Sequence, residues 1–222
     1  YMANVSIAFD ILPWLNVSGR AKVDNTNSIF TQKLYASSNT TITEGSTQGH
    51  YTEIRNTDEQ IYADVMVNIN KTFADNKFSL VANVGASIND TKSKELSYRG
   101  PIREVGIPNM FTVFDLDKEK SRPQKYGWQE QTQSIFASVE MGYKSMLYLT
   151  VTGRNDWASQ IHGTTDPSFF YPSVGLSAVI TEMVKLPQWV DYLKVRGSYS
   201  SVGSPYPRYL TIPTFPYDAT SQ

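Results

Sequence analysis

Hydrophobic and polar residues alternate over long stretches of this chain, so its dominant period is two rather than the 3.6 of an α-helix. Residues 60–72 alternate, and one parity of this stretch includes Ile61, Ala63, Val65, Val67 and Ile69. Residues 77–91 repeat the pattern after a short turn that is rich in Asp and Asn. Successive side chains of a strand point to opposite faces, so the pattern predicts a hairpin of two long, two-faced strands.

The same alternation predicts eight strands. They cover residues 2–11, 14–25, 60–72, 77–91, 129–142, 146–157, 169–180 and 192–202. Most of them exceed the length of a typical globular strand and reach the roughly 9–11 residues that a membrane-spanning strand needs. Short turns alternate with long polar connections at 26–58 and 93–128, and the later connections are intermediate in length. This arrangement is typical of outer-membrane barrels, which have short periplasmic turns and long extracellular loops.

Charged residues fall on one face of the predicted strands. The central positions of the apolar parity, such as 61–69 and 78–88, carry none, and the opposite parity carries Asp10, Arg20, Lys22, Asp24, Asp64, Glu140, Arg154, Lys194 and Arg196. A lipid-facing surface has to exclude charge, since an Arg or Lys at the bilayer midplane costs about 2–4 kcal/mol. The apolar face is rich in Gly, Ala and Val, and supplies few of the large side chains that fill a packed core. The pattern therefore favours a membrane barrel, while a soluble β-sandwich, which would also have one apolar face, stays open.

Composition narrows the chemistry more than the fold. The 222 residues include 20 Lys and Arg and 21 Asp and Glu, and the net charge of −1 argues against a nucleic-acid-binding surface. Cys is absent and His50 and His162 are the only histidines, which excludes thiol chemistry and disfavours a His-rich metal site. Calcium is a weak candidate at Asp115, Asp117 and Glu119, because the glycine and distal Glu of an EF-hand are missing. We therefore expect no cofactor.

Four segments resemble the barrel of SusC/RagA-type TonB-dependent transporters. They are LTVTGRNDW at 149–157, FYPSVGLSA at 170–178, Lys-Leu-Pro-x-Trp at 185–189 and LKVRGSYSSVG at 193–203. Their order and spacing match the family, and the clearest match covers about residues 130–203. The residues that carry the motifs are Gly153, Arg154, Asn155, Asp156, Trp157, Tyr171, Pro172, Arg196, Gly197 and Tyr199.

The resemblance implies an all-β chain whose eight or so antiparallel strands form part of a transmembrane β-barrel of about 22 strands. Residues 1–222 are then expected to be a segment of the barrel domain, without the plug domain, the TonB-interacting segment and the remaining strands. The resemblance also implies import of oligosaccharides or peptides across a Gram-negative, Bacteroides-type outer membrane. TonB–ExbB–ExbD would supply the energy, a SusD-like surface lipoprotein would form the lid, and no enzymatic activity is implied.

Two sets of side chains are candidates for contact with substrate or plug. The polar parity would line the lumen, where the candidates are Arg20, Lys22, Tyr62, Asp64, Arg154, Lys194 and Arg196. The long connections would hold aromatic platforms for a sugar or peptide at Tyr35, Tyr51, Tyr98, Phe111, Phe114 and Trp128. For each residue taken singly, a wall charge that pairs with a neighbour, or an aromatic ring packed inside its loop, is the simpler explanation.

Two other classes of protein stay open. An outer-membrane β-barrel enzyme would need an acid–base group such as His162, which shares a short connection with Ser159 and Asp166. A soluble β-rich carbohydrate-binding module would need no lipid-facing surface. Loss of a hydrolytic activity in His162→Ala would support the enzyme, and release of the folded protein into detergent-free buffer would support the module.

Overall fold

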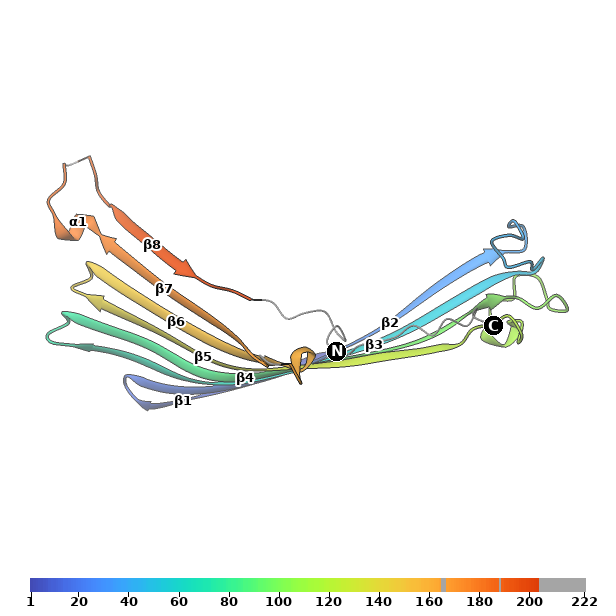
Figure 1. Ribbon diagram of the computed structural model, residues 1–222, viewed down its shortest axis with the longest axis horizontal. Coiled ribbons are helices and arrows are strands. Elements are labelled where there is room, and N and C mark those ends of the chain that lie inside the picture. The colour runs from blue at the N-terminus through green and yellow to red at the C-terminus, as the bar shows by residue number, and fades with distance from the viewer. Residues whose placement is uncertain (165–166, 188, 204–222) are drawn as a thin grey trace. The chain divides into compact units, whose positions relative to one another are not determined.

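The computed structural model describes residues 1–164, 167–187 and 189–203, and these residues are mainly β-structure (Figure 1). The strands are β1 (Met2–Leu12), β2 (Leu15–Tyr35), β3 (Gly49–Phe73), β4 (Phe78–Pro101), β5 (Gln124–Tyr143), β6 (Leu147–Ala158), β7 (Phe169–Val179) and β8 (Lys194–Ser200). The helical elements of these ranges are short: η1 (Val113–Asp115), η2 (Ser159–Ile161) and α1 (Ile180–Met183). No helix in the described ranges is long and apolar enough to cross a membrane.

The eight strands form one sheet in which the spatial order follows the chain order from β1 to β8 (Figure 1). Neighbouring strands run antiparallel, as the register between β5 and β8 shows strand by strand. Each strand therefore pairs only with its neighbours in the chain, and β1 and β8 form the two edges of the sheet. The expectation of an all-β fold with eight antiparallel strands is confirmed.

Four strands are longer than the alternation predicts. β2 runs to Tyr35 and β3 begins at Gly49, although the alternation predicts a connection at 26–58. β4 and β5 likewise extend into the expected connection at 93–128, which shrinks to 102–123. In these extensions polar side chains occupy both faces, so backbone pairing continues where no hydrophobic alternation marks it.

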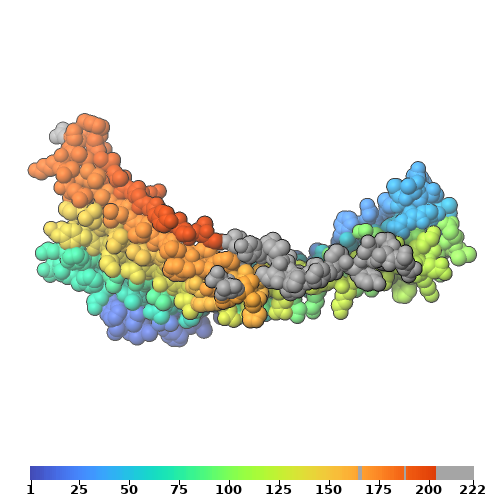
Figure 2. All heavy atoms as spheres, in the orientation of Figure 1, coloured from blue at the N-terminus to red at the C-terminus, as the bar shows by residue number. Residues whose placement is uncertain are grey.

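The chain divides into two compact units. The first, which we call the loop unit, consists of Tyr1–Ala3, Val23–Gln60 and Thr91–Gln129. The second, which we call the main unit, consists of Asn4–Lys22, Ile61–Asp90 and Glu130–Gln222. The main unit holds all the strands that carry the recognised motifs (yellow to red in Figure 2), and it is there that the two parities of the sequence can be followed in space.

In the main unit the two parities become the two faces of the sheet. One row across β5 to β8 consists of Val139, Val151, Val174 and Tyr199. The adjacent row consists of Ser138, Thr152, Ser173 and Ser200. Residues directly opposite each other in an antiparallel ladder share a face, so we call these surfaces the apolar face and the polar face.

Candidate functional site on the polar face of the sheet

The apolar face of the main unit is exposed, although large hydrophobic side chains are usually buried in water-soluble domains. Val65, Ile135 and Leu176 are 51%, 55% and 56% exposed, whereas Asp64 and Ser134, next in sequence to the first two, are buried. An apolar surface of this extent is unfavourable in water, so the face requires an apolar environment.

Aromatic side chains bound the apolar face at both ends. Exposed Trp157 and Phe170 lie at one end, and at the other end Phe78 packs on Tyr143 with ring centroids 5.0 Å apart. Between the two ends lies the stretch of β6 from residue 147 to residue 157. At about 3.3 Å per residue and a tilt of roughly 40°, this stretch gives a band about 25 Å tall, the height of the lipid-facing band of outer-membrane barrels.

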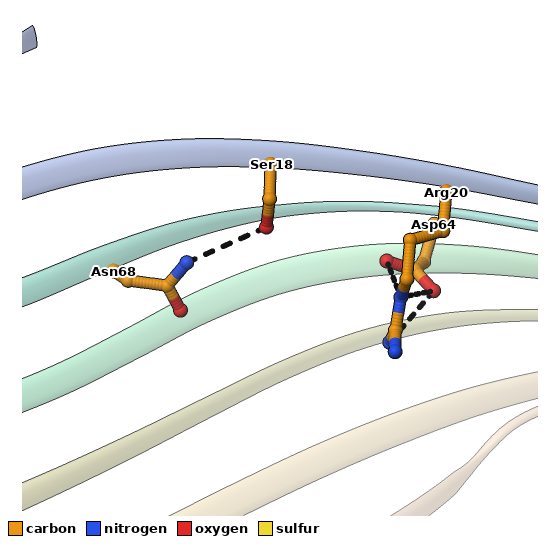
Figure 3. A network of polar contacts seen from close by, with 4 residues as sticks. All are labelled: Ser18, Arg20, Asp64 and Asn68. Atoms are coloured by element: carbon orange, nitrogen blue, oxygen red, sulfur yellow. Dashed lines mark hydrogen bonds and ion pairs between the residues drawn. The ribbon is translucent and has the colours of Figure 1, made fainter. Parts of the chain in front are cut away.

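A first polar cluster links β2 and β3 on the opposite face (Figure 3). Arg20 Nε donates to both carboxylate oxygens of Asp64, at 3.2 and 3.0 Å, and Arg20 Nη2 lies 2.9 Å from Asp64 Oδ2. Tyr62 interacts with the same carboxylate, and Asn68 donates to Ser18 Oγ at 3.4 Å. The Asp64 side chain is fully buried and that of Arg20 is 56% exposed, so this ion pair joins an enclosed anion to a partly hydrated cation.

This difference in burial predicts unequal effects when either partner of the pair is removed. Arg20→Ala leaves a buried carboxylate without its cation, whereas Asp64→Asn leaves a cation that water can solvate. We expect Arg20→Ala to lower the unfolding temperature of the assembled protein more than Asp64→Asn does, and the double variant to recover part of the loss. Heat-modifiable mobility on gels measures this, with Lys194→Ala as the control; equal losses in the two single variants would contradict the assignment.

A second polar cluster surrounds Arg154 of the GRNDW motif. Arg154 Nε donates to Asp156 Oδ1 at 2.7 Å, and Arg154 Nη2 donates to Ser134 Oγ at 3.0 Å. The guanidinium carbon lies 5.9 Å from the ring centroid of Phe136, and the register sets Arg154 opposite Phe136 and Tyr171. Three contacts fix a guanidinium that is half exposed, and a guanidinium held in this way suits a carboxylate or carbonyl oxygen.

A third polar area lies on β8, where Lys194 and Arg196 face Glu140 across a hollow of about 540 Å³. Lys194 Nζ lies 5.3 Å from the ring centroid of Tyr148. Glu140 accepts a hydrogen bond of 3.3 Å from the hydroxyl of Thr150. Cations on one side and a carboxylate on the other give this hollow groups that can bind either charge.

The structure groups some of the predicted lumen residues and separates others. Lys22 and Tyr62 line a hollow of about 420 Å³ together with Arg20. Arg154 belongs to the separate β5–β6–β7 cluster, and Lys194 and Arg196 to the β8 area. The three groups are therefore distinct polar areas on one face, and their contact with substrate or plug stays a prediction.

Two glycines allow aromatic rings to cover the sheet. A Cβ at Gly153 would lie 3.4 Å from the Phe170 ring, so the FYPSVG ring covers the GRNDW glycine on the apolar face. A Cβ at Gly85 would lie 2.7 Å from the Phe136 ring and 2.8 Å from the Val65 carbonyl oxygen. The sequence motifs pointed to Gly153, whereas the roles of Gly85, Phe136 and Ser134 follow only from the pairing of distant strands.

The structure corrects the placement of the aromatic residues that the sequence assigns to loops. Four of the six lie on strands: Tyr35, Tyr51, Tyr98 and Trp128. Phe111 lies in the 102–123 connection, with its ring centroid 5.1 Å from that of Tyr35 and 6.2 Å from that of Tyr51. Because Tyr51 is buried, it packs the loop unit internally, while Phe114 in η1 is 90% exposed.

Tyr51 also anchors a charged group that sequence reasoning missed. Glu53 accepts hydrogen bonds of 2.6 Å from the Tyr51 hydroxyl and of 2.6 Å from Arg55 Nε. These bonds hold the pKa of Glu53 below its ordinary value. Burial, aided by the bond to Glu53, raises the pKa of Tyr51 to about 12. A spacing of two residues along β3 puts the three side chains on one face. The segment is polar on both faces, so the sequence does not mark it as a strand and this spacing is not recognised.

These pKa shifts predict the pH range in which the loop unit is most stable. The Glu53 contribution is fully present above its ordinary pKa of about 4.3 and is lost as pH falls through the lowered folded value. The Tyr51 contribution is fully present below its ordinary pKa of about 10 and is lost as pH rises through the raised value. Hydrogen exchange at residues 49–60, corrected for intrinsic rates, measures the stability of the loop unit as a function of pH. It covers both the acid limb, assigned to Glu53, and the alkaline limb, assigned to Tyr51. Glu53→Gln should flatten the acid limb and also weaken the alkaline limb, because Glu53 helps to raise the Tyr51 pKa. An unchanged acid limb would contradict the assignment.

The carboxylates of the candidate calcium sequence have other partners. Asp115 accepts hydrogen bonds from Thr112 and from Arg103, and together these hold its pKa below the ordinary value. Asp117 Oδ1 accepts from the backbone N–H groups of Glu119 and Lys120. Among the described residues, no group of three or more His, Cys, Asp or Glu side chains is arranged to hold a metal ion.

The short connection that suggested an enzyme is described only in part. Ser159 Oγ accepts a hydrogen bond of 3.0 Å from the backbone N–H of Gln131. Ser159 and His162 line the same hollow of about 260 Å³ together with Trp157, and Asp166 lies outside the described residues.

Comparison with solved structures identifies the fold. The chain is similar to chains in the RagAB peptide transporter (TM-score 0.73, 19% identity) and in the RagAB peptide importer in its open-open state (0.71, 18%) and closed-closed state (0.68, 19%). Each match covers 90% of this chain and 22% of the other. The chain has the fold of a segment of a RagAB transporter chain.

The RagAB likeness confirms at the level of fold what the SusC/RagA motifs implied. The matched structures are transporters rather than enzymes. The present chain spans about a fifth of the length of the RagAB chains, 22%. No protein-family model matches the sequence, and no curated protein is significantly similar to it.

Proposed function

We propose that this chain is part of the barrel wall of a TonB-dependent outer-membrane importer for oligosaccharides or peptides. The observation that carries the proposal is the inversion of burial in the main unit. Exposed apolar residues form a band about 25 Å tall between aromatic girdles, and the buried or paired charges lie on the other face. A sheet of this kind separates hydrocarbon from an aqueous lumen.

The polar face then lines the transport path. Arg20 and Arg154 are held by Asp64 and Asp156, so they offer oriented donors rather than mobile charges. Peptide carbonyls and carboxylates, and sugar hydroxyls, can all accept from such donors. The similar RagAB proteins transport peptides, which favours peptides over oligosaccharides as the substrate.

The proposed transporter needs further parts besides these eight strands. A barrel of about 22 strands closes the wall, because eight strands of this sheet leave two unpaired edges that lipid does not tolerate. We propose that a plug engages TonB–ExbB–ExbD and that a SusD-like lipoprotein covers the extracellular side. The proposed location is the outer membrane of a Gram-negative, Bacteroides-type cell.

Fractionation and uptake of the full-length protein test this function. We expect the protein in the detergent-extracted outer-membrane fraction, and we expect labelled peptide uptake that stops when a protonophore removes the energy supply. A deletion strain complemented with the gene provides the control. Recovery of folded protein from detergent-free buffer, or uptake insensitive to the protonophore, would contradict the proposal, as would a hydrolytic activity that His162→Ala abolishes.

A further inference from the structure

One connection differs from the other three at the same end of the main unit. β1–β2, β3–β4 and β5–β6 are joined by tight turns at 13–14, 74–77 and 144–146. The connection between β7 and β8 runs over residues 180–193 and contains α1 (Figure 1). We call residues 180–193 the β7–β8 insert. A hairpin of two antiparallel strands needs only about two to five loop residues, so pairing of β7 with β8 does not require this length.

The described part of the insert is organised by its own hydrogen bonds. The Ile180 N–H donates to the Leu193 carbonyl at 2.8 Å and closes the insert at its base. The Val184 N–H donates to the Ile180 carbonyl at 3.0 Å, and the Val190 N–H donates to the Pro187 carbonyl at 2.9 Å. These bonds fix the backbone from which the side chains project.

The side chains that project from the insert are largely apolar and exposed. The exposed fractions are Met183 44%, Val184 53%, Trp189 83%, Tyr192 66% and Leu193 40%. Trp and Tyr rings combine an apolar body with a polar edge and concentrate at the headgroup level of membranes. Exposure of these rings next to a face that needs hydrocarbon indicates an interfacial position.

The insert also continues a girdle that the tight turns begin. Phe78 and Tyr143 pack together at this end, and Lys144 Nζ lies 5.3 Å from the Tyr143 ring centroid. Leu193 leads into Val195 of β8, which is 56% exposed on the apolar face. The aromatic side chains of the insert therefore extend an existing belt of aromatic and Lys side chains toward β8.

Charged residues within the insert favour lipid headgroups over a protein as the partner. Glu182, Lys185 and Asp191 are exposed among the apolar side chains. The cores of protein–protein interfaces are depleted in charged residues. A headgroup layer accommodates apolar, aromatic and charged side chains together, because water and lipid phosphates are present at the same depth as the upper acyl chains.

We propose that the β7–β8 insert is a membrane-interface anchor that seats Trp189 and Tyr192 in the phospholipid headgroup layer on the short-turn side of the bilayer. This inference rests on the proposed function for the position of the bilayer, and it adds a lipid contact made by a connection rather than by a strand. The anchor fixes the depth of β7 and β8 relative to the bilayer.

Spin labels at single cysteines test the anchor, because the chain has no native Cys. The full-length protein, with any cysteine outside this chain replaced, is labelled at Val184→Cys and reconstituted in phosphatidylethanolamine–phosphatidylglycerol vesicles. Val174→Cys on the apolar face and Asp75→Cys at the tip of the β3–β4 turn are the hydrocarbon and water references. Oxygen and a water-soluble nickel chelate then report the depth of each label.

We expect Val184→Cys to fall between the references, with nickel collisions several-fold fewer than at Asp75→Cys. Adding Trp189→Ala should move the label toward the water reference. Nickel accessibility equal to that of Asp75→Cys, or exclusion of both reagents as in a protein contact, would overturn the anchor. A water-accessible label at Val174→Cys would instead overturn the proposed function, so the two failures are distinguishable.

Discussion

Val174→Arg is expected to abolish assembly of the full-length protein in the outer membrane. Val174 is 45% exposed and stands in a row with Val151 and Tyr199, near the middle of the apolar band. Arg at the midplane of a lipid-facing strand costs about 2–4 kcal/mol, which is a large share of the net stability of a typical fold. The folded fraction in isolated outer membranes, measured by heat-modifiable mobility, should fall to near background.

Ser173→Arg is the matched control for this variant. Ser173 precedes Val174 on the same strand and lies opposite Thr152 and Ser200 on the polar face. A guanidinium there can reach water and neighbouring hydroxyl groups, so assembly should remain close to that of the unmodified protein. Equal loss in the two variants would contradict the assignment of the faces.

Gly85→Val is the second substitution with a large expected effect. A Cβ at Gly85 meets the Val65 carbonyl oxygen of the adjacent strand at 2.8 Å, and the Phe136 ring at 2.7 Å. The ring can rotate away, but the carbonyl is part of the backbone of β3, which pairs with β4, and it cannot move without shifting that strand. Overpacking of this kind costs about 1–3 kcal/mol or more, and we expect a clear drop in the denaturant midpoint of the purified protein.

Gly197→Val is the control for Gly85→Val, since a Cβ at Gly197 meets no atom within 4 Å. Both glycines lie inside strands, so the pair separates the loss of close packing from a general effect of changing a strand glycine. Phe136→Ala added to Gly85→Val should recover only part of the stability, because the clash with the Val65 carbonyl remains. Full recovery would show that the ring, and not the ladder, is the obstacle.

The fold could be predicted from the sequence where one face of a strand meets an apolar environment. Residues 61–69 and 78–88 alternate because one face of each strand is apolar while the other carries polar side chains. The extensions of β2 and β3, to Tyr35 and from Gly49, have no such constraint. Polar side chains occupy both faces there, so backbone pairing leaves no trace in the hydropathy pattern.

For the candidate site, the sequence predicts the face on which each residue lies but does not predict its partners. The parity of Arg20, Asp64 and Arg154 follows from counting residues along each strand. The pairing of Arg20 with Asp64 joins residues 44 positions apart, and it depends on the stagger between β2 and β3, which no local pattern encodes. Ser134 and Phe136 contact Arg154 because of the register between β5 and β6, which the sequence of neither strand encodes by itself.

The order of the strands has a consequence for how the wall is built. Every strand pairs with its neighbours in the chain, so each new ladder closes over a connection that is short compared with the whole chain. Closing short loops costs little entropy and favours fast assembly. The sheet can therefore grow one hairpin at a time, with the last completed strand serving as the template for the next.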